Sequence, residues 1–188
     1  MQCPSVEVSV DAGALVAGDR DAWQRLVELE TPAVFRTCYR ILGRIDDAED
    51  AAQETFLSAY RSIGSFRGDG VAAAWLMRIA TRESWRRAAR MRRVSQASSS
   101  LDEQGSDQLR GPSNPLDETL SAEQREQIRH AVARLPEPYR EVVSLRFLSE
   151  LSIADIAVVA NRPEGTVKAQ LHRGLERLRR EIGGLVTA

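Results

Sequence analysis

Two groups of side chains in the sequence have the types and spacing that suit contact with nucleic acids. The first is a block from residue 78 to residue 93, which holds seven arginines against Glu83 and carries a charge of +6. Trp75 and Trp85 are interleaved with it, and such a mixture suits a phosphate backbone together with a stacked or wedged base. Two other interpretations stay open: a solvated helix face, and a surface for carboxylates such as the acidic blocks of the chain itself.

The second group lies in residues 151–177, which have the spacing of a DNA-reading helix-turn-helix. Ala157 stands four residues before Asn161, a residue type that tolerates the left-handed turn conformation. The face of the last helix that points outward is then polar and basic, and its members are Thr166, Gln170, Arg173 and Arg177. Glu164, Lys168 and His172 are further candidates. The alternative is an ordinary three-helix bundle with a solvated basic face, but the turn spacing favours DNA binding.

Helices must position both groups, because apolar residues recur at spacings of three and four with no sustained alternation. We therefore predict an all-α fold of two small helical domains. In the first half, Thr31 and Pro32 indicate a break between two helices, the second of which ends at Gly43. A helix from Asp46 to Gly64 has an acidic start, and a helix opening at Val71 carries the arginines.

In the second half, Ser121 and Gln124 form a candidate capping box. Ser152 is expected to start a short helix, and residues 166–182 form the last helix, which Gly183 and Gly184 are expected to end. The domain boundaries that follow are a tail over 1–18, a helical domain over 19–93, a flexible linker over 94–116 and a helix-turn-helix domain over 117–184. The linker is rich in Ser, Gly, Pro, Asp and Gln and lacks apolar periodicity.

The net charge of −1 conceals alternating acidic and basic blocks. Residues 44–54 carry −4 and residues 101–126 carry −5, so local patches matter more than the total. Cys3 and Cys38 lie far apart and support neither a zinc site nor a disulfide framework, and Cys38 is expected to be a buried small hydrophobe. No apolar run approaches the roughly 20 residues that span a bilayer. We expect a cytoplasmic protein without cofactor, metal or catalytic residues, and therefore not an enzyme.

Several motifs in matching order resemble the extracytoplasmic-function sigma factors of bacterial RNA polymerase. They are DAEDAAQETFLSAYRSIGSFRG at residues 47–68, WLMRIA at 75–80, and LPEPYREVVSLRF, LSIADIA and PEGTVKAQLHRGLERLR in the second half. The resemblance covers residues 20–93 and 117–182. It implies an alternative sigma factor that binds core RNA polymerase and directs promoter recognition, DNA melting and transcription initiation.

The resemblance assigns three sets of residues to these contacts. Core polymerase binding falls to the acidic helix: Asp47, Glu49, Asp50, Gln53, Glu54 and Phe56. Its acidity has an alternative explanation in the helix dipole. The minus-ten element falls to the loop and the arginine helix: Ser65, Phe66, Arg67, Asp69, Trp75, Arg78, Arg82 and Arg86. The minus-thirty-five element falls to the helix-turn-helix: Arg162, Thr166, Lys168, Gln170, His172, Arg173 and Arg177.

Two positions depart from the family pattern, because Arg82 stands where Asn is usual and Arg86 where Asp is frequent. The minus-ten specificity therefore does not carry over, and Ala169 and Gln170 in the recognition helix differ from the frequent Ser and Arg. Few residues follow the last predicted helix, so we expect control by an anti-sigma factor, as the resemblance implies, rather than by an appended domain. The alternative function is a stand-alone helix-turn-helix transcriptional regulator.

Overall fold

The computed structural model describes residues 10–66, 72–97 and 121–186. Within these ranges the regular elements are all helices, which confirms the predicted all-α class. The first half of the molecule comprises α1 (Ala12–Val16), α2 (Arg20–Leu42), α3 (Ile45–Ser62), the 3-10 turn η1 (Ile63–Ser65) and α4 (Ala72–Ala97). The second half comprises α6 (Ala122–Arg134), α7 (Tyr139–Phe147), α8 (Ile153–Ala160) and α9 (Glu164–Val186).

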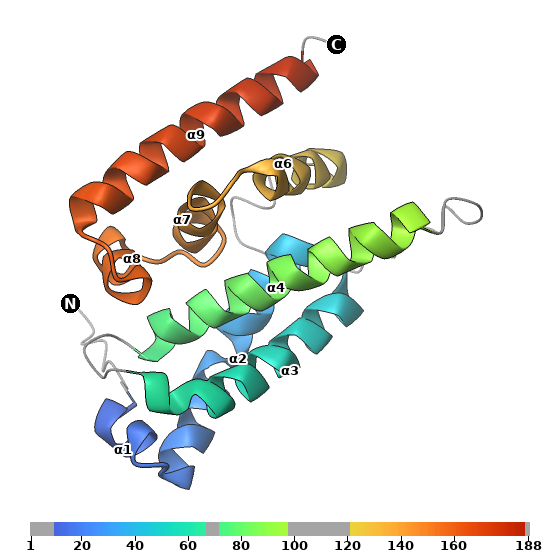
Figure 1. The fold of residues 1–188 in the computed structure, drawn as a ribbon. Coiled ribbons are helices and arrows are strands. Elements are labelled where there is room, and N and C mark those ends of the chain that lie inside the picture. The colour runs from blue at the N-terminus through green and yellow to red at the C-terminus, as the bar shows by residue number, and fades with distance from the viewer. Residues whose placement is uncertain (1–9, 67–71, 98–120, 187–188) are drawn as a thin grey trace, which may run out of the picture.

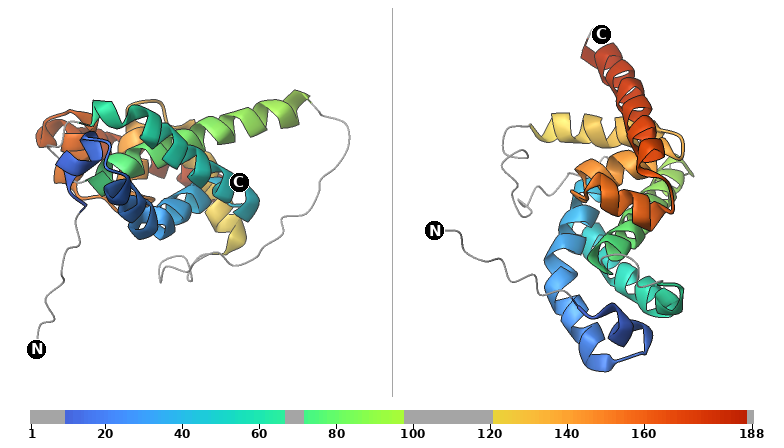
Figure 2. Two further views of the ribbon diagram at one scale, coloured as in Figure 1. Left: turned by 90° about the horizontal axis from the view of Figure 1, so that it is seen from below. Right: turned by 90° about the vertical axis from the view of Figure 1, so that its left-hand side faces the viewer.

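Helix α4 belongs to the first half and lies on the side of it that faces the second half (Figures 1 and 2). It packs against α2 and α3 on one side and against α7 and α8 on the other. No helix within the described ranges combines the length and the apolar character that a membrane crossing requires.

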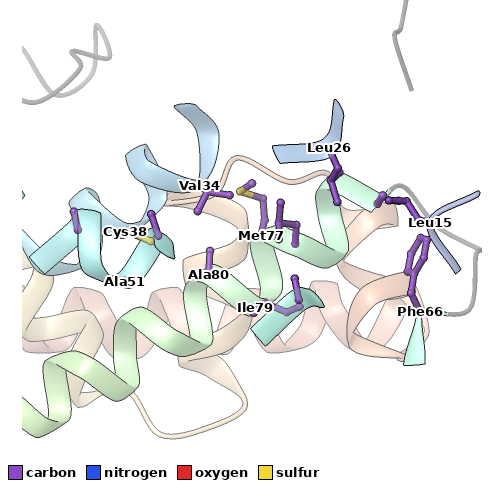
Figure 3. Close-up of a cluster of buried hydrophobic side chains, with 14 of the residues drawn as sticks. Leu15, Leu26, Val34, Cys38, Ala51, Phe66, Met77, Ile79 and Ala80 are labelled. Carbon is purple, nitrogen blue, oxygen red and sulfur yellow. The ribbon is translucent and has the colours of Figure 1, made fainter. Parts of the chain in front are cut away.

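The core of the first half is built from small side chains, which let the helices approach closely. Buried alanines occur on α3 and α4 at Ala48, Ala51, Ala52, Ala59, Ala72, Ala74 and Ala80. Leu26, Val34 and Cys38 of α2 meet them in the centre of this core (Figure 3). Burial raises the pKa of the Cys38 thiol to about 11, so the thiol stays protonated and behaves as the small hydrophobe that was predicted.

The predicted break at Thr31 and Pro32 is wrong, because α2 runs without interruption from Arg20 to Leu42. Both residues are exposed, so the proline ring points to solvent and not into the core. Pro32 lacks the amide that would donate to the Glu28 carbonyl, and the Thr31 hydroxyl donates to the Val27 carbonyl, one residue earlier, at 2.6 Å. The buried stripe continues past the proline, from Ala22 and Leu26 to Val34, Cys38 and Ile41. Packing of this stripe decides the helix length.

The predicted ends of two other elements also differ from the structure. The presumed tail over residues 1–18 contains α1, which Asp11 caps by accepting from the Gly13 amide at 2.8 Å. Leu15 of α1 is 2 % exposed in the core, while residues 1–9 lie outside the described residues. Helix α4 continues to Ala97, so the first four residues of the predicted linker are helical. The rest of that linker lies outside the described residues.

The last helix is longer at both ends than its sequence pattern predicts. It begins at Glu164, because the carbonyl of Pro163 accepts from the amides of Thr166 and Val167. It passes through Gly183 and Gly184 to Val186. A glycine ends a helix by adopting the left-handed conformation, and among the described glycines those with positive φ are Gly18 and Gly43. Gly43 ends α2 in this way, as predicted.

The second half follows its predicted starting signals. Ser121 and Gln124 form the capping box of α6, and Ser152 caps α8 by accepting from the amide of Asp155. Asn161 adopts the left-handed conformation between α8 and α9, with φ of 52°. The junction of the two helices is filled by Val142, Leu145, Ile156 and Val167, with Leu171 packed against them. The helix-turn-helix geometry is therefore present.

Helix α9 packs directly on α7 at Gly174, a contact that no sequence pattern indicates. A Cβ built at this position would lie 2.8 Å from Cγ2 of Val143 and 3.4 Å from Cβ of Tyr139. The separation of 2.8 Å from Val143 is shorter than real Cβ contacts allow, so a side chain at position 174 would push the two helices apart.

We expect Gly174→Ala to lower the free energy of unfolding. Overpacking costs about 1–3 kcal/mol. The gain in helix propensity from Gly to Ala is roughly 1 kcal/mol, so over most of that range the cost is larger than the gain. The matched control is Gly165→Ala, because a Cβ there meets nothing within 4 Å. Urea denaturation followed by circular dichroism measures both variants. Equal stability of the two variants would contradict the close contact.

Candidate polymerase and nucleic-acid interfaces

Helix α3 divides into a buried small-residue stripe and an exposed acidic stripe. The buried stripe is Ala48, Ala51, Ala52, Thr55 and Ala59. The exposed stripe follows the same spacing of three and four: Asp46, Glu49, Asp50, Gln53, Glu54 and Leu57. Four of the predicted polymerase-binding residues thus share one surface, the α3 acidic stripe. Leu57, half exposed at its end, was missed by the sequence reasoning, although its spacing from the acidic residues indicates the same face.

The other two predicted polymerase-binding residues lie off this stripe. Phe56 packs against the core of the first half. Asp47 is largely buried, with 14 % of its side chain exposed, and accepts from Nε of Arg87 at 3.0 Å and from Nη2 at 2.7 Å. Arg87 also binds Asp50 at 2.7 Å. Desolvation opposes the charge of Arg87, but the hydrogen bonds and attraction of the two aspartates outweigh it and raise its pKa.

The arginines of α4 fall into two groups. Those on the exposed side are Arg82, Arg86, Arg90, Arg92 and Arg93, and Arg86 pairs with the buried Glu83 of the same helix. Arg78 and Arg87 are half buried and pair with carboxylates of the chain itself. The structure therefore contains both of the alternatives left open for this block: a solvated face, and a surface for the chain's own acidic groups.

The loop residues assigned to the minus-ten element are only partly described. Ser65 belongs to η1, and Arg67 and Asp69 lie outside the described residues. Phe66 is 6 % exposed, and its ring centroid lies 5.2 Å from that of Trp75. Both rings contact the core of the first half, so in this arrangement they anchor the start of α4.

The helix-turn-helix presents its predicted outward face to solvent. Thr166, Lys168, Arg173 and Arg177 are exposed on α9, as is His172. The guanidinium of Arg177 lies over the ring of Tyr139, 5.1 Å from the centroid, which orients it on the helix surface. Gln170 and Arg162 are half buried, and Arg162 donates to the Gln170 amide oxygen at 3.2 Å. Five of the seven predicted residues are thus exposed: Thr166, Arg173 and Arg177 share one face of α9, and Lys168 and His172 lie on another side of the helix.

Comparison with known proteins identifies both halves. The model of "Sigma-70 region 2" matches residues 26–94, and that of "Sigma-70, region 4" matches residues 125–178. The ECF RNA polymerase sigma factor SigW of Bacillus subtilis is 36% identical over 89% of this chain and 92% of the relative. The chain belongs to the extracytoplasmic-function (ECF) sigma factors. The ECF sigma-E factor of Haemophilus influenzae is 33% identical over 90% of this chain and 92% of its own length.

Solved structures share the fold of this ECF sigma factor. CnrH in complex with the cytosolic domain of CnrY has a TM-score of 0.57 at 19% identity, covering 92% of this chain and 95% of the other. RpoE of Bartonella quintana in complex with the anti-sigma factor NepR has a TM-score of 0.53 at 23% identity, covering 85% and 96%. The protein is an alternative sigma factor, a transcription initiation factor of RNA polymerase.

In this sigma factor the two halves meet along a seam in which α4 contacts α7 and α8, and α2 contacts α6 and the loop after α7. Arg40 of α2 donates to the carbonyl of Leu148 at 3.0 Å and binds Glu150 at 2.9 Å. The hydroxyl oxygens of Thr81 and Ser149 lie 3.1 Å apart. Sequence reasoning missed these contacts, because polar residues of such different sequence positions give no periodic signal.

Trp85, a candidate for base stacking, is buried in the seam with 8 % of its surface exposed. Its indole Nε1 donates to Oγ of Ser144 at 3.0 Å. The guanidinium of Arg140 lies 5.9 Å from the ring centroid, and Val143 belongs to the same apolar cluster. In this arrangement Trp85 joins the two halves and is not available to a base.

We expect Ser144→Ala to destabilise the folded chain by about 1–3 kcal/mol, because a buried indole N–H loses its acceptor. In a Trp85→Phe background the same substitution should cost less, since no N–H remains to be satisfied. A double-mutant cycle from urea denaturation isolates this coupling. Equal costs in the two backgrounds would show that the hydrogen bond does not contribute.

Proposed function

We propose that this ECF sigma factor docks on core RNA polymerase through the α3 acidic stripe and reads the minus-thirty-five element with the exposed face of α9. The observation that supports the second part is the division of α9, whose stripe around Val167 is buried while Arg173 and Arg177 are exposed. Exposed arginines next to a left-handed helix-turn-helix turn suit phosphates and guanine edges in the major groove.

Minus-ten recognition falls to α4 and the loop before it. Arg82 and Arg86 are exposed on α4 and can meet phosphates of a melted strand. Arg78 and Trp85 are held by the second half, so they become available only when α7 moves away. Because Arg82 and Arg86 replace the usual residues of the family, the base preference of this surface is a property of this chain.

The two halves act as separate domains in this proposal. Residues 19–93 and 117–184 are the domains, and the segment between them is the tether, which lets each address its own promoter element. The acidic and basic faces of the free chain compete for one another, so docking on polymerase presents both DNA-reading surfaces at high effective concentration. The protein acts in the cytoplasm and as a binding factor, not an enzyme.

An anti-sigma factor is the proposed negative regulator. Two structural neighbours, CnrH and RpoE, were solved as complexes, and the second complex contains an anti-sigma factor. Specific RNA synthesis by the purified chain tests the function as a whole. It should occur at a mapped promoter only when core polymerase is added. Specific regulation by the chain without core enzyme would favour a stand-alone regulator instead.

We expect Arg173→Ala to weaken holoenzyme binding to the minus-thirty-five element about 10-fold, the loss of one good phosphate or base contact. Association with core polymerase should not change. The control is Arg179→Ala, an equally exposed arginine of α9 that lies on a different face. Fluorescence anisotropy with promoter duplex measures DNA binding, and co-precipitation measures core binding. A loss of core binding in Arg173→Ala would refute the assignment.

We expect Asp50→Arg to weaken association with core polymerase at least about 10-fold, because a reversed charge at the centre of the α3 acidic stripe repels a basic docking partner. It also faces Arg87, so folding is checked by circular dichroism. Glu123→Arg is the control, since it makes the same charge change at an exposed position of α6. If both variants bound core polymerase equally well, the acidic stripe would not be the docking surface.

A further inference from the structure

The carboxylate of Glu141 on α7 joins two arginines that belong to different DNA-reading surfaces. Its Oε1 accepts from Nε of Arg78 on α4 at 2.9 Å. Its Oε2 accepts from Nη2 of Arg162, at the turn of the helix-turn-helix, at 2.7 Å. Arg78 also donates to the carbonyl of Val159 on α8. One carboxylate thus occupies a guanidinium of each assigned promoter-binding surface.

A carboxylate in this position offers the arginines what a DNA phosphate offers. Both groups are anions whose oxygens accept charge-assisted hydrogen bonds from guanidinium groups, and here each oxygen of Glu141 accepts from a different arginine. The side chain of Glu141 is 18 % exposed, and those of Arg78 and Arg162 are 35 % and 25 % exposed. Partial burial strengthens these pairs relative to fully exposed ones, yet leaves them within reach of a competing anion.

The remaining seam contacts also hold α4 against the second half. The Trp85 indole bonds Ser144, and the Thr81 hydroxyl meets that of Ser149. An apolar cluster crosses the seam, with Ile41 and Trp85 from the first half and Val132, Leu135 and Val143 from the second. Glu141 therefore lies in an ordered interface and is not a single chance pair.

We propose that Glu141 is an autoinhibitory latch that substitutes for DNA phosphate at Arg78 and Arg162 and holds α4 against α7 in the free sigma factor. Binding of DNA phosphate to Arg78 and closure of the seam by Glu141 exclude one another, while the pair of Glu141 with Arg162 lies within the second half. Opening exposes Arg78, Thr81 and Trp85 together. The proposal rests on the DNA-binding function proposed above and adds the residue that represses it.

Glu141→Gln tests the latch in the free full-length chain, because the amide keeps the shape of the side chain and removes its charge. We expect a larger radius of gyration in small-angle X-ray scattering. We also expect a lower apparent dissociation constant for a fluorescent duplex of mixed sequence, by about fivefold, because this constant scales inversely with the open fraction. The charge-matched control is Glu123→Gln, whose carboxylate contacts Gln127 on its own helix.

Two results would overturn the latch. The first is an unchanged radius of gyration in Glu141→Gln, and the second is DNA affinity no higher than in Glu123→Gln. The control matters because the loss of any negative charge strengthens DNA binding to some extent. Circular dichroism confirms that both variants are folded.

A disulfide across the seam provides a second, independent test. The hydroxyl oxygens of Thr81 and Ser149 lie 3.1 Å apart, so Thr81→Cys with Ser149→Cys places two thiols within reach of each other. Cys3→Ser in the same chain leaves Cys38 as the other cysteine, and Cys38 is fully buried. We expect the oxidised protein to bind the duplex more weakly than the reduced protein, because Arg78 and Trp85 stay covered, and dithiothreitol to restore the affinity.

Failure of a crosslink to form on a non-reducing gel would contradict the closed seam in solution. Unimpaired DNA binding by the oxidised protein would contradict its inhibitory role. Transcription with added core polymerase separates these outcomes from the proposed function itself. If wild-type protein gave no promoter-specific RNA, the sigma-factor assignment of these surfaces would fail, while scattering and crosslinking would still report on the latch.

Discussion

The structure depends on α4, which has to bury two faces at once. One face packs into the alanine-lined core with α2 and α3, where Leu76, Met77 and Ala80 are buried. The other face meets α7 and α8 through Arg78, Thr81 and Trp85. A helix buried on both sides leaves only its edges for solvent. The exposed arginines are confined to these edges and to the end of the helix, and this restriction decides which of them a free chain can offer to DNA.

Ion pairs within the fold also limit which arginines are free to contact other molecules. The chain is almost neutral as a whole, with a net charge of −1, and within the described residues several of its carboxylates and arginines are paired with each other. Asp47 and Asp50 hold Arg87, and Glu141 holds Arg78. Each such pair gives a guanidinium carboxylate oxygens of the kind that a phosphate offers. The same sequence that supplies a cationic surface to DNA therefore also supplies its internal competitor.

Local sequence signals predicted the helix starts well, and long-range packing explains where they failed. The caps at Ser121 and Ser152 and the left-handed Asn161 depend on neighbours a few residues away, and the structure confirms them. Pro32 does not break α2, because packing of the buried stripe outweighs the hydrogen bond that proline removes. The two glycines near the end of α9 did not stop it, because no left-handed cap forms there.

In the candidate sites, too, local sequence features were predicted and long-range contacts were not. The family resemblance grouped Glu49, Asp50 and Glu54 as one set, and the structure leaves them exposed together on α3. The resemblance could not show that Asp47 turns toward Arg87, which is forty residues away in sequence. Trp85 and Glu141 carried no signal of their seam contacts for the same reason. A pattern within one helix defines a face, but only the packing of the helices decides what covers it.

The composition of the seam indicates that it can open. Its ion pairs each have a partner that is partly exposed and contribute about 1 kcal/mol each, and its two neutral hydrogen bonds, Trp85 to Ser144 and Thr81 to Ser149, each contribute a similar amount. The apolar cluster of Ile41, Trp85, Val132, Leu135 and Val143 adds to this, but it is small beside the core of the first half. Reversing a closed equilibrium from 1:99 to 99:1 requires about 5.5 kcal/mol of differential binding. Docking on a large partner together with phosphates at several arginines can supply that amount, whereas non-specific DNA at physiological salt supplies much less. The seam thus has the stability expected of a contact that a free sigma factor keeps and a holoenzyme on a promoter gives up.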